Sequence, residues 1–173
     1  MKKIVAILSV LAIIIGSCGQ TANKPNSTTE NIVETGTIVA ELFVEWLMNE
    51  EKLQLLFSDN WTFIYHENNR CDGSTDGQIS NLPPFKVDEI IRIKVMNDGD
   101  GWLCDKKEPK EFYLDFSLKE HVKNWDRIEI SGYEIQEKKL VYIEGWGESD
   151  YIKLYFDNHN LITKMEYRSE DPG

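Results

Sequence analysis

The last third of the chain limits the fold most strongly, because β-rich runs alternate there with very short connections. Runs rich in β-branched and aromatic residues cover residues 126–136, 139–147, 151–156 and 161–169. The segments between them are short and turn-like, such as DNHN before the last run. Short connections favour antiparallel neighbours, so these runs predict a four-strand meander. In the third run, Ile152, Leu154 and Phe156 are expected to share one face.

The front of the expected domain has helical rather than strand periodicity. Apolar residues recur with helical spacing at Val39, Leu42, Phe43, Trp46 and Leu47. One or two further helical turns are expected in EEKLQLLF, and the following WTFIYHE has the content of a strand. The chain is therefore predicted to be α+β, with N-terminal helices packed on a curved antiparallel sheet that ends in the four-strand meander.

The middle of the chain is more ambiguous. Residues 68–85 read as a long turn-rich stretch, because glycine, asparagine, aspartate and proline are frequent there. Residues 87–96 favour a strand, since Ile91, Ile93 and Val95 alternate. Residues 111–125 begin with strand character and continue with helical character in SLKEHVKNW.

The N-terminus has the pattern of an exported protein. Lys2 and Lys3 precede an uncharged apolar run of signal-peptide length, which is short for a transmembrane helix. The four residues that follow, Ile15-Gly16-Ser17-Cys18, resemble the lipobox of bacterial lipoproteins. The resemblance implies cleavage after Ser17 and lipidation of Cys18, with two or three acyl chains giving stable anchoring. An ordinary secretory signal and an uncleaved membrane anchor are the alternatives.

This pattern divides the chain into a signal peptide at 1–17, a flexible tether at 18–30 and a single domain at 31–173. The tether is rich in Asn, Ser, Thr and Lys. No aspartate follows Cys18 directly, which in lipoprotein sorting goes with the outer membrane, and an acidic surface-export cluster is absent from the tether sequence. The expected location is the periplasmic face of the outer membrane.

The charge of the chain narrows the class of partners. The net charge of −11 becomes −13 once Lys2 and Lys3 are removed with the leader. Such a chain repels nucleic acid and anionic lipid head groups. Membrane attachment is therefore expected through the N-terminal lipid alone, and no nucleic-acid partner is expected.

Two cysteines remain if Cys18 carries lipid. In an oxidising compartment, Cys71 and Cys104 are expected to form a disulfide. Its loop of about 34 residues stabilises by about 3–4 kcal/mol on the chain-entropy model. The alternatives are two free thiols or a metal site shared with His66, although the spacing fits no zinc pattern.

The order of helices, strand, irregular middle and closing meander resembles the nuclear transport factor 2-like superfamily, over roughly residues 32–168. The segments GESDYIKLYF and EYRSEDPG also resemble domains of bacterial lipoproteins. The first resemblance implies a cone-shaped α+β fold with a pocket. Some members are isomerases or dehydratases with an acid–base residue in that pocket, and many others are non-catalytic. The resemblance transfers no functional residue to this chain.

The first expected strand carries the best candidates for ligand contact. Trp61, Phe63 and Tyr65 share one face, and stacked aromatic rings suit a sugar, lipid or peptide ligand. Packing into the core is the competing interpretation. His66 is the histidine best placed for acid–base work, but Glu67 and Tyr65 point to the opposite face and cannot be its partners. The sequence therefore assigns no catalytic residue.

The sequence DGSTDGQI partly matches a calcium-binding loop. Asp72, Ser74 and Asp76 occupy ligand positions, but Pro83 stands where a bidentate glutamate is required. A solvated turn explains these residues equally well, so the sequence predicts no metal and no cofactor.

The preferred functional hypothesis is a lipid-anchored, periplasm-facing envelope protein whose domain binds without catalysis. Its partner is expected to be a small molecule, a glycan or an envelope protein. A small pocket enzyme of the isomerase or dehydratase type and a structural subunit of an envelope complex are the alternatives.

Overall fold

The structure, a computed structural model, describes the backbone at residues 38–47, 51–86, 88–123, 125, 127–135, 138–146 and 150–170. It describes the side chains of these residues except those at 51, 127 and 131–146. The predicted signal peptide, Cys18 and the predicted tether lie outside the described residues.

The described part of the chain is built around an eight-stranded mixed sheet with strand order β4-β3-β2-β1-β8-β7-β6-β5. The strands are β1 (Phe57–Asn69), β2 (Gly73–Leu82), β3 (Ile91–Asn97), β4 (Lys110–Phe116), β5 (Arg127–Ile135), β6 (Lys138–Trp146), β7 (Asp150–Phe156) and β8 (Ile162–Glu170). Helical elements accompany this sheet but are few, so the α+β class is confirmed only in this coarse sense. The expected antiparallel sheet is wrong, because one strand pair, β1 and β8, is parallel.

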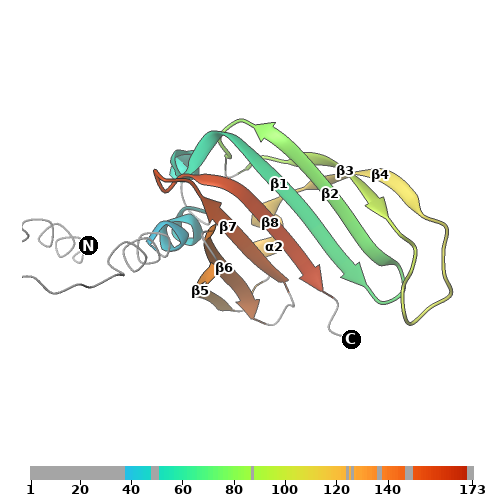
Figure 1. Cartoon of the computed structure of the whole chain (residues 1–173). Coiled ribbons are helices and arrows are strands. Elements are labelled where there is room, and N and C mark those ends of the chain that lie inside the picture. Colours follow the sequence, from blue (N-terminus) through green and yellow to red (C-terminus); the bar gives the residue numbers. More distant parts are fainter. Residues whose placement is uncertain are drawn as a thin grey trace, which may run out of the picture.

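The sheet consists of two antiparallel halves. β1 to β4 pair in sequence order, and so do β5 to β8. The halves meet where β1 and β8 run parallel, with Tyr65 opposite Tyr167. In Figure 1 these two long strands lie side by side, with β2 to β4 on one side of them and β5 to β7 on the other. The centre of the sheet therefore joins segments that are far apart in sequence.

Within the described residues, three short helical segments accompany the sheet. Residues 38–47 are helical, and η1 (Glu51–Leu56) is a 3₁₀ helix that leads into β1. α2 (Leu118–Val122) follows β4 and precedes β5, which lie at opposite edges of the sheet. Ser117 caps α2 by accepting a hydrogen bond from the Glu120 amide at 3.5 Å. The buried side chains of α2 are Leu118 and Val122.

We call the sheet face that carries the buried side chains the inner face. β3 shows the pattern most clearly, because Ile91, Ile93 and Val95 are buried while the residues between them are exposed. Aromatic rings dominate the core next to the start of β1: Phe57 and Phe85 lie 4.7 and 5.8 Å from the Trp61 ring.

The structure agrees with the expected strands at 61–67 and 87–96, which lie within or overlap β1 and β3. It also gives a strand followed by a helix within 111–125. The turn-rich prediction for 68–85 is wrong, because most of this stretch is β2. The residues misread as turn formers have strand roles: Asp76 is on the outer face, and a Cβ at Gly77 would lie only 2.7 Å from Val95 Cγ1.

The strand conformation of β2 also removes the calcium-loop interpretation of Asp72, Ser74 and Asp76. A calcium loop needs a tight turn that points its oxygens inward, whereas Ser74 and Asp76 lie on an extended strand. Asp76 instead pairs with His66 of β1.

Candidate functional site

A row of polar residues crosses the inner face beyond the aromatic core. Neighbouring strands place these residues opposite one another in register, from the edge strand inward: Lys110, Asn97, Thr75, Glu67, Ser169 and Asp150. Partners in register lie on the same face of a sheet. The polar row is therefore continuous from β4 to β7.

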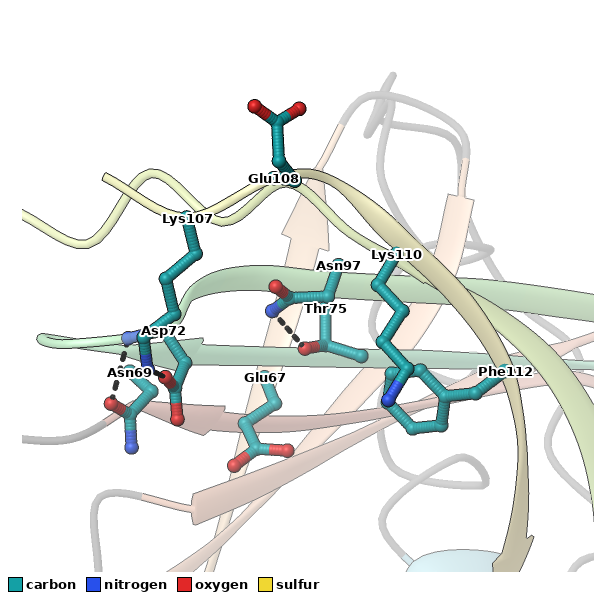
Figure 2. Close-up of a pocket in the computed structure, with 9 residues that line it drawn as sticks. All are labelled: Glu67, Asn69, Asp72, Thr75, Asn97, Lys107, Glu108, Lys110 and Phe112. Carbon is teal, nitrogen blue, oxygen red and sulfur yellow. Dashed lines mark hydrogen bonds and ion pairs between the residues drawn. The ribbon is translucent and has the colours of Figure 1, made fainter. Parts of the chain in front are cut away.

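A cleft of about 370 Å³ covers the β1–β4 part of this row. It also includes residues of the β1–β2 turn and of the loop between β3 and β4. Its lining residues, drawn in Figure 2, are Glu67, Asn69, Asp72, Thr75, Asn97, Lys107, Glu108, Lys110 and Phe112. All of them except Phe112 carry a side chain that is able to form hydrogen bonds.

Several lining residues are held by contacts with one another. Asn97 Nδ2 donates a hydrogen bond to Thr75 Oγ1 at 2.8 Å, and Lys107 forms an ion pair with Asp72. The Lys110 ammonium lies 5.9 Å from the centre of the Phe112 ring. Figure 2 shows the Glu108 carboxylate pointing away from the other lining side chains.

Two tyrosines adjoin the polar row and donate hydrogen bonds to its carboxylates. Tyr65 Oη donates to Glu67 Oε2 at 2.6 Å, and Tyr167 Oη donates to Asp150 Oδ2. The two tyrosine rings are stacked, with centroids 5.9 Å apart. Burial, followed by these hydrogen bonds, raises the pKa of both hydroxyl groups far above the usual range. Both hydroxyl groups therefore stay protonated, and as hydrogen-bond donors they orient the carboxylates of Glu67 and Asp150.

The His121 ring of α2 packs against this cluster. Its centroid lies 4.5 Å from the Phe116 ring and 5.1 Å from the Tyr167 ring. Its Nδ1 lies 2.6 Å from the Ser117 carbonyl oxygen. Since that oxygen only accepts, Nδ1 carries the proton. The imidazole is held on the core side of α2.

A disulfide fixes the two loops that form one end of the cleft. Cys71 in the β1–β2 turn is bonded to Cys104 in the β3–β4 loop, with Cα atoms 4.7 Å apart. The Leu103 amide donates a hydrogen bond to the Arg70 carbonyl at 2.9 Å. A Cβ at Gly101 would lie 2.4 Å from the Cys71 carbonyl carbon, so the close approach of the two loops requires glycine. The structure thus brings together the two cysteines that the sequence pairs.

The aromatic residues nominated from the sequence share one face but lie in the core. Trp61, Phe63 and Tyr65 are 1%, 0% and 4% exposed, and none of them lines the cleft. Trp61 Nε1 donates a hydrogen bond to the Pro83 carbonyl at 2.6 Å. Tyr65 adjoins the cleft only through its hydrogen bond to Glu67.

His66 lies on the outer face, away from the cleft. Its Nδ1 is 2.6 Å from Asp76 Oδ1 of β2, a partner that the sequence did not nominate. The expected alternation is seen, because Glu67 lines the cleft while His66 does not. The structure therefore separates His66 from the other nominated residues.

Sequence patterns did not identify four of the lining residues as site residues: Thr75, Asn97, Lys107 and Lys110. Thr75 fell in the stretch misread as turn, and Lys107 is in a loop. One signal was present: Glu67 continues the alternation of Trp61, Phe63 and Tyr65 onto the same face. The partners of Glu67 depend on strand register, which single-strand patterns do not contain.

The described residues contain no group of three or more histidine, cysteine or acidic side chains that could hold a metal ion. Among them, no helix has the length and apolar character needed to cross a membrane.

Comparison with known proteins adds no relative: no family model matches the chain, and neither does any curated protein or solved structure.

Proposed function

We propose that this chain is a lipid-anchored protein on the periplasmic face of the outer membrane, and that its domain binds a small polar molecule without catalysis. The lipobox-like sequence ending at Cys18 supports the anchor. The observation that carries the binding role is the polar cleft of about 370 Å³ at the end of the inner face. None of its lining residues belongs to the hydrophobic core, which lies further along the same strands.

The arrangement of titratable groups favours binding over catalysis. The histidine that the enzyme hypothesis relied on, His66, is paired with Asp76 on the outer face. At the cleft, Glu67 accepts a hydrogen bond from Tyr65, whose raised pKa keeps it protonated. A carboxylate held in one orientation in this way is suited to orienting a ligand.

For the fold, we propose helices packed on a curved sheet that ends in a four-strand meander, related to the nuclear transport factor 2-like superfamily. The consecutive antiparallel pairing of β5 to β8 supports the meander. The Phe43 ring of the helical segment 38–47 lies 6.2 Å from the Phe57 ring, which supports helix-on-sheet packing. If the proposal is right, a solved structure of a related protein should contain the same parallel contact between β1 and β8.

Fractionation of cells that express the Cys18→Ala variant tests the anchor. We expect the variant to enter the soluble periplasmic fraction or to accumulate as an unprocessed precursor, with wild type in the membrane fraction. A processed variant that remains in the membrane fraction contradicts the lipid anchor.

Native mass spectrometry of the protein purified from its own envelope tests the binding role. We expect a retained small molecule that is lost from Glu67→Gln and kept by the outer-face control Asp76→Asn. A co-purifying protein without a small ligand supports the structural-subunit alternative. Turnover of a candidate compound by wild type, abolished in Glu67→Gln, supports the enzyme alternative.

A further inference from the structure

We infer that the cleft takes a neutral, hydroxyl-rich ligand, and that its natural ligand is a short carbohydrate. The inference rests on the proposed function, since it names the chemical class for the same cleft. Three features of the lining carry it: balanced charge, a mixed set of hydrogen-bonding groups and one exposed aromatic ring.

The charges that face into the cleft cancel. Glu67 and Asp72 supply two carboxylates, and Lys107 and Lys110 supply two ammonium groups. Asp72 and Lys107 already form an ion pair, and the Glu108 carboxylate points away in Figure 2. A cleft that selects a phosphate or a polyamine is expected to have an excess of one sign of charge. The balance here favours a ligand without net charge.

The hydrogen-bonding groups include both donors and acceptors at short spacing. Glu67 uses Oε2 to accept from Tyr65, so its carboxylate is held in one orientation. Asn97 donates to Thr75 at 2.8 Å, which fixes the amide next to it in the row. Strand spacing places neighbours in this row about 5 Å apart. A sugar ring matches such a row, because each of its hydroxyl groups both donates and accepts.

Phe112 supplies an apolar surface within this polar cleft. Its side chain lies on the edge strand β4 and is 36% exposed. No other lining residue is aromatic. The C–H face of a sugar ring can lie over such a ring while its hydroxyl groups reach the polar row. An anionic ligand such as phosphate gains nothing from this contact, because the face of the ring is electron-rich.

The volume of the cleft also fits this class. A value of about 370 Å³ lies near the lower end of the range of about 300–1,000 Å³ for small-molecule sites. Lipid ligands need walls of apolar side chains, whereas Phe112 is the one lining residue of this cleft whose side chain carries no polar group. A short oligosaccharide is small and polar enough to occupy it.

Isothermal titration with defined probes tests the ligand class. The neutral probes are cellobiose, maltose, lactose and N,N′-diacetylchitobiose, supplemented by an array of neutral and acidic glycans. Inorganic phosphate, spermidine and octanoate represent anionic, cationic and apolar ligands. The protein is the full mature chain, and every variant is checked for folding by circular dichroism.

Matched variants on the same strands locate the site. Phe112→Ala and Glu67→Gln are expected to weaken binding of a neutral glycan about tenfold or more. Their controls, Tyr113→Ala and Asp76→Asn, are expected to change it by less than about twofold, because both residues lie outside the cleft lining. Tyr113 follows Phe112 on β4 and is 61% exposed, so its loss is not expected to affect folding.

The possible results separate this inference from the proposed function. Binding of a charged or apolar probe that is lost in Glu67→Gln, with no binding of neutral glycans, overturns the carbohydrate class and leaves the binding role intact. Glycan binding that is insensitive to Glu67→Gln and Phe112→Ala overturns the assignment to this cleft. No binding by any probe, together with no retained ligand in native mass spectrometry, overturns both.

Discussion

The two ends of the inner face are built from the same strands but differ in chemistry. At one end, Trp61, Ile93 and Phe116 are almost fully buried. At the other end, the same strands carry Glu67, Asn97 and Lys110, which line an open cleft. Both ends obey the same two-residue alternation. Alternation therefore determines which face a side chain occupies, but the polarity along the strand determines whether that face becomes core or binding surface.

Residues that maintain the fold lie at the apolar end of the inner face, and residues that are available to a ligand lie at the polar end. Core burial accounts for the stability of the apolar end, at about 25 cal/mol per Å² of apolar surface removed from water. Apart from its disulfide, the polar end gains much less from its internal contacts, since an exposed ion pair contributes about 0–1 kcal/mol. Changes that leave the disulfide intact should therefore differ strongly between the two ends in their effect on unfolding.

The largest effect is expected from Trp61→Ala at the apolar end. The change removes a buried ring and its hydrogen bond to Pro83, and we expect a loss of about 3–5 kcal/mol in the free energy of unfolding. Urea unfolding measures it. Trp102→Ala is the control, because Trp102 is 70% exposed and should cost about 1 kcal/mol or less. Equal losses for the two tryptophans contradict the assignment of Trp61 to the core.

The second-largest loss in the free energy of unfolding is expected when the disulfide at the polar end is removed. The Cys71→Ala, Cys104→Ala double variant should lose about 3–4 kcal/mol, because the unfolded chain is no longer constrained. Unfolding of wild type with and without reductant gives an independent measurement. Intact mass after alkylation checks the oxidation state, and two alkylated thiols in the unreduced, folded protein contradict the disulfide.

A smaller effect is expected at the boundary between the two ends, from Tyr167→Phe. The change removes the donor to Asp150 and leaves the ring in place, so we expect a loss of about 1.5–3 kcal/mol. Thermal unfolding measures it against Tyr113→Phe, whose ring is exposed and should be neutral. A neutral Tyr167→Phe variant means that the hydrogen bond to Asp150 does not stabilise the fold.

The smallest effect on the free energy of unfolding is expected for a change at Glu166, on the outer face. Burial favours its neutral form, but hydrogen bonds from Lys164 and Tyr155 outweigh burial and lower the pKa below its ordinary value near 4.5. Since the folded-state pKa is the lower one, this stabilisation is present above the ordinary pKa and is lost as pH falls through the folded value.

The variant Glu166→Gln tests this pH dependence. It should lose about 1 kcal/mol at neutral pH and show a weaker decrease of stability between neutral and acidic pH. Chemical unfolding at a series of pH values measures both. An unchanged acid dependence contradicts the lowered pKa of Glu166.

The sequence predicted the apolar end better than the polar end, for a physical reason. Burial leaves a periodic pattern in the strand itself, and Ile91, Ile93 and Val95 were identified from it. The β2 strand was missed because its outer-face residues are polar and because Gly77 is needed for close packing against Val95. When one strand is considered alone, polar residues and a glycine are typical of a turn.

Most of the candidate site could not be predicted from sequence patterns. Its row depends on register between strands, so Glu67, Thr75 and Asn97 become neighbours only after the sheet is assembled. The cysteine pair was predictable because two cysteines remain once Cys18 is assigned to the lipid and because the expected compartment is oxidising. His66 was correctly separated from Glu67 by alternation, but its partner Asp76 also required the register of β1 and β2.

The parallel contact between β1 and β8 has a consequence for the order of folding. Synthesis proceeds from the N-terminus, so β1 to β4 emerge first and leave one edge of β1 unpaired. An open strand edge is a template for pairing with other chains. That edge is covered only when β8, the last strand described, arrives and aligns Tyr167 with Tyr65. Contacts of such long sequence separation form slowly. The stacked tyrosines at the centre of the sheet thus mark the point at which this edge of β1 is closed to other chains.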